Sequence, residues 1–400
     1  TINSVNIGKG ANSVSSNTVL GENALDASVT GGSNTAIGKA ALGANTSGAN
    51  NTAVGHAALD ANTTANSNTA VGMGSLTTNL TGQFNSALGV SSLALNTTGE
   101  SNNAFGLQAL DANTTGSTNN AFGNNALGSN TTASNNSAFG NNALAANTTG
   151  TKNTAVGSLV LDATTTGYAN TGVGYNSLGS NTTGYQNTAI GELALHTATT
   201  ANNNVAVGHK ALQLATDGEN NTALGTFSLD ALTTADVCTA LGRSALSAVT
   251  TGGDNIGIGY FAGGQLSTGI RNIAIGNYAL DAATTGEGNI CIGYSAGSHI
   301  TTASLNLAVG HFALQRCTTG TRNTALGRIV LEDVTTENDN TGIGYNSLAN
   351  TTASQNTAVG SSTAANNTTG TNNVAVGYAA LNVNTTGANN VAVGANALDA

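Results

Sequence analysis

The 400-residue chain lacks proline and tryptophan, and only 7% of its residues are charged. Ordinary globular domains carry about 25% charged residues. Gly, Asn, Thr, Ala and Ser dominate, a composition also typical of disordered low-complexity chains. Disorder does not require apolar residues at fixed positions. In this chain a sequence repeat places apolar residues at fixed positions, so we expect a packed interior.

Positively charged residues are few: the chain has 9 Lys and Arg and 19 Asp and Glu, which gives a formal net charge of −10. Nucleic acid requires a basic surface, so we predict no nucleic-acid partner. We find no apolar run of about 18 residues, no basic amphipathic segment and no signal peptide, and predict no membrane segment in this fragment. We expect a fragment because the chain starts at Thr1 and stops two residues after Leu398, inside a repeat.

Residues that bind metals are few and scattered. Cys238, Cys291 and Cys317 occupy different positions of different repeats and match neither a metal-binding spacing nor a disulfide framework. His56, His209 and His311 share one position of the repeat, but they lie 153 and 102 residues apart. We therefore predict no metal site and no cofactor.

What the sequence has is a repeat. The pentapeptide N-T-A-V-G recurs, with variations, in 24 copies, and its Gly is taken here as position 0. The interval is 17 residues from Gly21 to Gly344, and the exceptions are a first interval of 13 and one of 16 before Gly360. A fixed period near 20 indicates a repeat architecture. We predict an irregular first coil or cap over 1–20 and a continuous repeat array over 21–400, with a one-residue deletion between 344 and 360.

The repeat predicts an all-β, parallel β-solenoid (a β-roll or β-helix) of about 24 coils with 17 residues per coil. The consensus from −4 to +12 is N-T-A-V-G-x-x-A-L-x-x-N-T-T-G-x-x. Position −1 is apolar in all 24 copies and position +4 is Leu in 20, so we expect both to face inward. The pentapeptide and x-A-L predict two short strands, and N-T-T-G predicts a turn. Predicted core residues are Val54, Leu59, Val71, Leu76, Phe105 and Leu110.

Position −4 is Asn in 22 of the 24 copies, with Ser4 and Cys238 as the exceptions. A column of identical amides can form hydrogen bonds along a stack, as in Asn ladders. We favour such a structural ladder, rather than a row of groups that bind a ligand. Its members include Asn34, Asn51, Asn68, Asn85, Asn102, Asn119, Asn136, Asn153, Asn170 and Asn187.

The thin predicted core favours assembly. Each coil buries about two large apolar side chains, worth roughly 1.5–3 kcal/mol each, whereas ordering the backbone costs about 1–2 kcal/mol per residue. Position −2 is nearly always Ala or Gly, so we expect a neighbouring copy to dock against that face. A homo-oligomer follows, and threefold symmetry would suit a fibre.

The motif N-[ST]-A-[VI]-G followed by x-x-A-L resembles the head repeats of YadA-type trimeric autotransporter adhesins. The longer unit NTAVGxxALxxNTTGxxN resembles tandem repeats of phage tail-fibre proteins, which often carry an endosialidase-type intramolecular chaperone domain. The resemblance implies a left-handed, trimeric solenoid that is extracellular, on a cell surface or on a virion. The period of 17 is longer than that of the adhesin heads. Such repeats hold no catalytic residues, so none is carried over.

Aromatic residues and acids offer candidate contacts. Five tyrosines at position +1 could stack on glycans, although we favour the interpretation that this turn position tolerates many residues: Tyr175, Tyr260, Tyr294, Tyr345 and Tyr378. The carboxylates of segment 331–339 could bind Ca²⁺, but we favour a solvated loop.

Two further features concern the turns and the core. Asn-Thr-Thr sites fit the N-glycosylation pattern at Asn96, Asn113, Asn130, Asn147 and Asn181. Gly263 and Gly297 stand where Leu is expected, which predicts different packing there.

We therefore predict a structural, non-enzymatic fibre: the shaft or stalk of a phage tail fibre or bacterial surface adhesin. Its partners would be copies of itself and a cell-surface receptor or glycan. An ice-binding or other flat-face solenoid is the main alternative. A self-polymerising filament and a polysaccharide-degrading tailspike are the others, and the tailspike would need convergent acids on adjacent coils.

Overall fold

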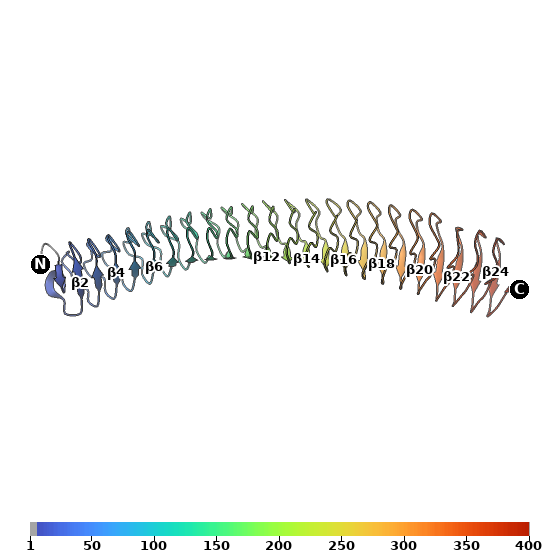
Figure 1. Ribbon diagram of the computed structural model, residues 1–400, viewed down its shortest axis with the longest axis horizontal. Helices are drawn as coiled ribbons and strands as arrows, with labels where there is room; N and C mark the ends of the chain where they lie inside the picture. The colour runs from blue at the N-terminus through green and yellow to red at the C-terminus, as the bar shows by residue number, and fades with distance from the viewer. Residues whose placement is uncertain (1–5, 400) are drawn as a thin grey trace. The chain divides into compact units, whose positions relative to one another are not determined.

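The computed structural model describes residues 6–399, so Ser4 lies outside the described residues. The chain divides into two compact units, unit 1 (Thr1–Asn202) and unit 2 (Asn203–Ala400). Within each unit the strands of successive repeats lie side by side (Figure 1). Each unit is a parallel β-solenoid with one short strand per 17-residue turn, which confirms the predicted fold class.

The strands of unit 1 are β1 Asn6–Gly8, β2 Thr18–Gly21, β3 Thr35–Ile37, β4 Thr52–Val54, β5 Thr69–Val71, β6 Ser86–Leu88, β7 Asn103–Phe105, β8 Asn120–Phe122, β9 Ser137–Phe139, β10 Thr154–Val156, β11 Thr171–Val173 and β12 Thr188–Ile190. Those of unit 2 are β13 Val205–Val207, β14 Thr222–Leu224, β15 Thr239–Leu241, β16 Ile256–Ile258, β17 Ile273–Ile275, β18 Ile290–Ile292, β19 Leu307–Val309, β20 Thr324–Leu326, β21 Thr341–Ile343, β22 Thr357–Val359, β23 Val374–Val376 and β24 Val391–Val393. Strand pairs from β2 to β12 and from β13 to β24 are parallel and in register.

The first strand differs from the rest. β1 pairs with β2 in the antiparallel direction, with Ile7 opposite Leu20, and a 3₁₀ turn follows it at Ala11–Ser13. The short first interval of 13 residues therefore belongs to a reversal of the chain and forms no 17-residue coil.

Backbone hydrogen bonds join each coil to both neighbours. The N–H of Gly55 donates to the carbonyl of Ile37 in the preceding coil (2.8 Å), and the N–H of Leu59 donates to Ser75 in the following one (3.1 Å). Gly55 has φ +141°, a conformation that side chains avoid, and a Cβ there would lie 2.4 Å from the carbonyl oxygen of Gly72. The close approach of stacked coils thus explains why position 0 repeats as glycine.

The strand faces are the reverse of the sequence-based prediction. Position −1 is only partly buried at Val54, Val71 and Phe105. Position −2 is fully buried at Ala53 and Ala70. The strand therefore points its small −2 residue inward and its large −1 residue outward. Leu59, Leu76 and Leu110 are fully buried.

The leucine of the preceding coil accounts for the small −2 residue. A Cβ added to Gly257, at position −2, would lie 2.6 Å from Cγ of Leu246, the +4 leucine of the preceding coil. The space at position −2 is therefore tight, and the larger residues found there in β2–β24 are Val19 in β2 and Cys291 in β18, whose repeat has Gly297 in place of leucine. The prediction that a neighbouring copy docks against position −2 is accordingly wrong, because the chain itself fills that space.

The x-A-L segment is a turn, not the second strand predicted. Ala58 and Leu59 are consecutive, yet both are fully buried, which an extended strand would not allow. Leu59 adopts φ 51°, and Ala57 adopts φ 54°. A left-handed residue costs roughly 1–2 kcal/mol, and burying the leucine side chain returns roughly 1.5–3 kcal/mol. The repeated Leu thus stabilises a turn that its backbone alone disfavours.

Two irregular repeats are absorbed locally. A Cβ on Gly297 would lie 2.6 Å from Sγ of Cys291 and 2.9 Å from Cδ1 of Ile300, so these two side chains occupy the space that a leucine would take. The one-residue deletion falls in the turn after Thr352: the hydroxyl of Thr352 reaches the carbonyl of Thr368 across an interval of 16 residues (3.1 Å).

Candidate binding surfaces

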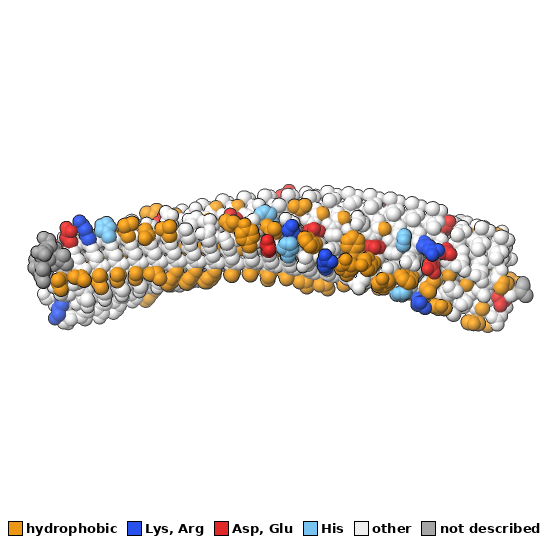
Figure 2. Space-filling view, in the orientation of Figure 1, with side chains coloured by type: hydrophobic (Ala, Val, Ile, Leu, Met, Phe, Trp, Pro, Cys, Tyr) orange, Lys and Arg blue, Asp and Glu red, His pale blue; other side chains and the backbone are white. Residues whose placement is uncertain are grey.

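An apolar row runs along the exposed face of the strands. We call it the outer stripe, and it consists of the −1 residues of β2–β12 in unit 1 and of β13–β24 in unit 2. The exposed fraction is 46% at Leu88 in unit 1 and 44% at Leu224 in unit 2. The row follows the strands along each unit (Figure 2). Phe122 stacks between Phe105 and Phe139, with ring centroids 4.7 and 4.9 Å apart. Every described coil of both units contributes a large apolar side chain to this surface.

Position −3 shares the outer face. It is Thr in most strands of unit 1, but β16–β19 carry Ile256, Ile273, Ile290 and Leu307 there. In these four strands the outer stripe is two residues wide, and all three residues of each strand are apolar or small. Strands that read as continuous apolar runs are typical of parallel sheets covered on both faces.

The predicted asparagine ladder is present and lies inside the coil. The amide oxygen of Asn51 accepts from the N–H of Asn68 (2.9 Å), and its Nδ2 donates to the carbonyl of Ala65 (2.9 Å). The same pattern continues through both units. The following are all buried: Asn34, Asn51, Asn68, Asn85, Asn102, Asn119, Asn136, Asn153, Asn170 and Asn187. Being buried and bonded to backbone, they offer no binding surface.

Cys238 stands in this ladder in place of Asn. Its N–H donates to Oδ1 of Asn221 (2.8 Å), and its thiol contacts the carbonyl of Gly252 (3.4 Å). Burial raises the pKa of Cys238 to about 11 and that of Cys317 to about 12, and it also raises the pKa of Cys291. All three thiols are free and buried.

A second ladder, at position +7, was missed in the sequence. Nδ2 of Asn113 donates to Oδ1 of Asn96 (2.8 Å), and Nδ2 of Asn130 donates to Oδ1 of Asn113 (2.9 Å). The column runs from Asn45 to Asn147 in unit 1, and apolar residues fill the same position from Leu232 to Ile300 in unit 2. That exchange of Asn for Leu, Val and Ile was the available signal of an interior position.

The Asn-Thr-Thr sites lie in this buried column. The five side chains that fit the glycosylation pattern are fully buried and face the coil interior: Asn96, Asn113, Asn130, Asn147 and Asn181. They are inaccessible to a modifying enzyme once the coil has formed.

Aromatic and basic side chains gather at one corner of unit 2. We call it the aromatic corner, and it comprises positions +1 and +2 from His209 to Tyr345. The ring of Tyr278 meets Tyr260 edge-on at 5.2 Å and Tyr294 edge-on at 6.2 Å. Tyr294 stacks on His311 at 5.3 Å. These rings come from four consecutive coils and form one continuous surface.

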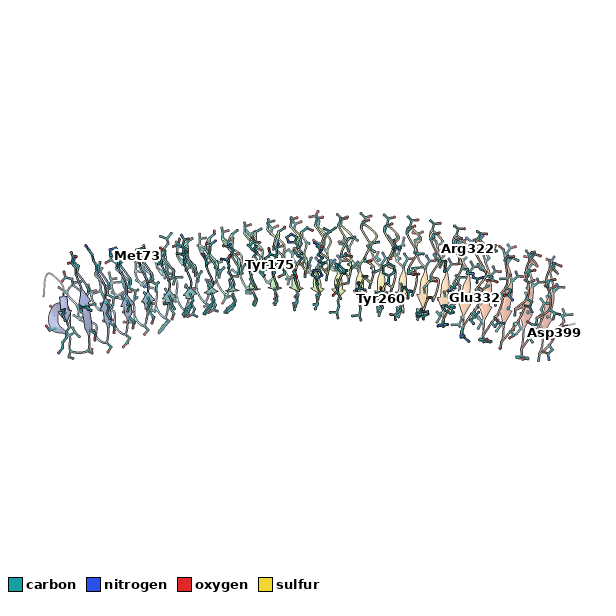
Figure 3. All side chains as sticks on the ribbon, in the orientation of Figure 1. Met73, Tyr175, Tyr260, Arg322, Glu332 and Asp399 are labelled. Atoms are coloured by element: carbon teal, nitrogen blue, oxygen red, sulfur yellow. The ribbon has the colours of Figure 1, made fainter. Side chains whose placement is uncertain are left out.

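Basic residues flank these rings. The guanidinium of Arg243 lies over Tyr260 (5.7 Å to the ring centroid), and that of Arg328 lies over Tyr345 (5.9 Å). Tyr175 in unit 1 and Tyr260 in unit 2 are both at the surface (Figure 3). Of the five tyrosines singled out in the sequence, Tyr260, Tyr294 and Tyr345 belong to the aromatic corner. Tyr175 and Tyr378 are exposed outside it.

The acidic run 331–339 forms bonds with its own surroundings. Asp333 pairs with Arg316, and Asp339 with Arg322 (2.7 Å), each from the preceding coil. Glu337 accepts from the N–H of Thr335 (2.6 Å), and bonds of this kind outweigh burial and lower its pKa. Across residues 6–399 no three or more His, Cys, Asp or Glu side chains are grouped to hold a metal ion.

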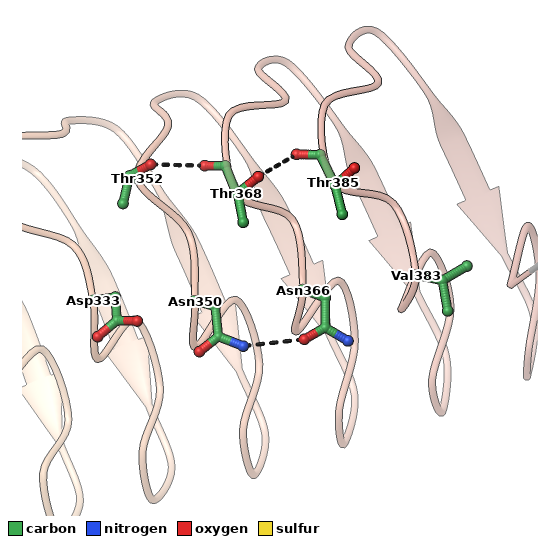
Figure 4. Close-up of a pocket in the computed structure, with 7 residues that line it drawn as sticks. All are labelled: Asp333, Asn350, Thr352, Asn366, Thr368, Val383 and Thr385. Carbon is green, nitrogen blue, oxygen red and sulfur yellow. Dashed lines mark hydrogen bonds between the residues drawn. The ribbon is translucent and has the colours of Figure 1, made fainter.

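An open groove lies on unit 2 between Asp333 and Thr385 (Figure 4). Its polar groups are bonded within the wall: Nδ2 of Asn350 donates to Oδ1 of Asn366 (3.1 Å), and the hydroxyl of Thr368 donates to the carbonyl of Thr385 (2.8 Å). These ladders leave the groove with no convergent set of reactive groups.

Comparison with known proteins gives no relative: no protein-family model matches the chain, and no curated protein is significantly similar to it. Among the described residues, no helix has the length and apolarity needed to cross a lipid bilayer.

Proposed function

We propose that the chain is a structural, self-associating solenoid: the shaft or stalk of an extracellular fibre, on a virion or a bacterial surface, assembled as a homotrimer. The observation that carries this proposal is the outer stripe. Parallel sheets are normally covered on both faces, and here the coil covers only the inner one. Large contiguous apolar patches on soluble proteins mark interaction sites.

A second copy of the chain is the partner that fits the stripe best. The stripe recurs with every described coil from β2 to β12 and from β13 to β24, so its partner must present the same spacing over the same number of coils. Another solenoid of this sequence does so without adjustment. Closed rotational symmetry lets each copy contribute the same face, and three copies agree with the resemblance to trimeric adhesin and tail-fibre repeats.

The distribution of polar groups also supports the proposed structural role. The buried amides are used in ladders, and the acidic run is used in ion pairs and turn bonds. Each of these bonds joins neighbouring coils or closes a turn. Such a chain supplies stiffness and length, and its outward turns supply contacts to a receptor or glycan.

Substitutions in the outer stripe test this proposal. Phe122→Lys combined with Ile275→Lys places one charge in the stripe of each unit, and a buried unpaired charge opposes association strongly. The matched control is Asn124→Lys, which adds a charge two residues along the same coil at an exposed position. We expect the stripe variant to lose the oligomer by light scattering, and the control to retain it. An oligomer that survives in the stripe variant, with an unchanged circular dichroism spectrum, would refute the proposed interface.

Ice binding remains the second candidate because the Thr of position −3 is now placed on the outer face. Thr35, Thr52 and Thr69 lie in register on β3–β5, and Thr154, Thr171 and Thr188 on β10–β12. Ser86, Asn103, Asn120 and Ser137 interrupt the column between them. Thermal hysteresis in dilute solution would favour this candidate, and its absence would dismiss it.

A further inference from the structure

The aromatic corner is confined to one part of the chain. Positions +1 and +2 of the β8 and β9 repeats in unit 1 are asparagines, for example Asn124 and Asn141, whereas seven of the nine repeats from His209 to Tyr345 carry a ring at one of these positions. The outer stripe, by contrast, continues through every coil of both units. A surface needed for assembly along the shaft should recur in the same way. The aromatic corner does not recur in this way, which indicates a ligand that binds at one part of the chain.

The backbone holds the corner rigidly. The N–H of Phe261 donates to the carbonyl of Arg243 (3.1 Å), that of Tyr278 to Tyr260 (3.0 Å), and that of Phe312 to Tyr294 (3.1 Å). Each +2 residue is thus bonded to the +1 residue of the preceding coil. Rings carried on such a ladder are fixed in spacing before any ligand arrives, which lowers the entropic cost of binding.

The corner is extended. His209 and Tyr345 lie eight coils apart in sequence, and strands stack about 4.8 Å apart, so the row measures roughly 38 Å. An extended row of rings suits a linear chain of repeating units better than a compact small molecule. Sugar rings have apolar faces that pack on Tyr and Phe, and their hydroxyls stay in water.

The charges of the aromatic corner indicate which kind of linear polymer it would bind. In the described residues the ion pairs use Lys39, Arg271, Arg316 and Arg322, and they include neither Arg243 nor Arg328. Positions +1 and +2 hold no carboxylate between His209 and Tyr345, and the acids nearest the corner are Asp230, close to Lys210, and Asp281, close to Tyr278. An arginine that lies over a ring can still bind a carboxylate through two parallel hydrogen bonds.

We propose that the aromatic corner of unit 2 binds a linear acidic polysaccharide, whose sugar faces pack on Tyr260, Tyr278 and Tyr294 and whose carboxylates bind Arg243 and Arg328. This goes beyond the structural role proposed above and stands independently of the number of copies in the assembly. A single-stranded nucleic acid would use the same stacking chemistry, and its binding is therefore one of the outcomes of the test below.

The test is isothermal calorimetry of the full chain with three probes: an oligogalacturonate long enough to span the corner, the same oligomer with its carboxylates methyl-esterified, and a single-stranded oligonucleotide of similar length. We expect the acid to bind more tightly than the ester, with an affinity that falls as salt rises. Tyr260→Ala, Tyr278→Ala and Tyr294→Ala combined should weaken binding of the acid by roughly tenfold or more.

Two further variants separate the parts of the proposal. Arg243→Gln with Arg328→Gln should lower the affinity for the acid roughly fivefold and leave that for the ester unchanged. Tyr175→Ala with Tyr378→Ala, which removes exposed tyrosines outside the corner, should change neither.

Three outcomes would overturn the proposal. They are no binding of the acid or of its ester, equal binding by the wild type and the triple tyrosine variant, or tighter binding of the single-stranded oligonucleotide than of the acid. A triple variant that loses the oligomer in light scattering and keeps its affinity would reassign the corner to contacts between copies.

Discussion

Replacing one amide of the +7 ladder should weaken unit 1 locally. In Asn113→Ala, Oδ1 of Asn96 loses the donor that lies 2.8 Å away, and Nδ2 of Asn130 loses its acceptor at 2.9 Å but keeps the carbonyl of Ala133 (3.1 Å). Asn96 is fully buried, so water cannot replace the lost donor. The unpaired oxygen and the two lost bonds together cost about 2–4 kcal/mol.

Native-state hydrogen exchange measures this effect, because repeat arrays open locally and a single unfolding midpoint would average it away. A cost of about 2–4 kcal/mol corresponds to roughly 30- to 700-fold faster exchange in the coils around Asn113. Unit 2 should be unaffected. Asn113→Thr should keep part of the protection, since Thr164 already accepts a bond from Asn181 in this column (3.3 Å). Asn124→Ala, at an exposed position, is the matched control. Equal exchange in Asn113→Ala and Asn124→Ala would refute a stabilising role for the ladder.

Three other predictions concern the backbone, the thiols and a carboxyl group. Gly140→Ala should destabilise unit 1 severely in urea unfolding, because its φ is +145° and the new Cβ would lie 2.3 Å from the carbonyl oxygen of Gly157; stability like that of Asn141→Ala would contradict this. Burial raises the pKa of Cys238 to about 11, so iodoacetamide at pH 8 should alkylate the cysteines only after unfolding, and rapid labelling of the folded chain would show an accessible thiol. Burial also raises the pKa of Asp281 above its ordinary value of 3.8, so the ionised carboxylate destabilises the folded state at neutral pH. Below pH 3.8 the carboxyl group is protonated in both the folded and the unfolded state, and this effect disappears. Asp281→Asn should therefore raise the free energy of unfolding at pH 7, and the gain should vanish in acid; a gain that persists in acid would exclude this cause.

The fold follows from the sequence because the period is fixed. A glycine that recurs every 17 residues, with apolar residues in constant phase, leaves few architectures other than stacked coils. The ladder of Asn51 and Asn68 was predictable for the same reason. Only stacking in register brings identical amides together at every repeat.

The orientation of the strand was not predictable from alternation alone. In T-A-V both faces show a consistent pattern, and the larger residue, Val54, was assigned to the interior. The deciding quantity is the width of the coil, which holds Ala53 beside the stacked leucines and takes the larger Cys291 where Gly297 replaces leucine. That width depends on the left-handed turn at Leu59, a conformation that a sequence pattern gives no reason to expect for leucine.

The candidate surfaces were only partly foreseen. Tyr260, Tyr294 and Tyr345 were identified by their shared position, but Phe261, Tyr278 and Phe312 occupy the next position and were not. Positions +1 and +2 meet in space because the N–H of each +2 residue bonds to the preceding coil. Sequence spacing alone does not show that contact.

The most direct test of the central claim is the solution mass of the intact chain by multi-angle light scattering. The chain mass is 39.0 kDa, and a fibre assembled through the outer stripe predicts a stable species near three times that value at micromolar concentration. A monomer of 39.0 kDa that persists as concentration rises would contradict self-association and leave the outer stripe to a different partner.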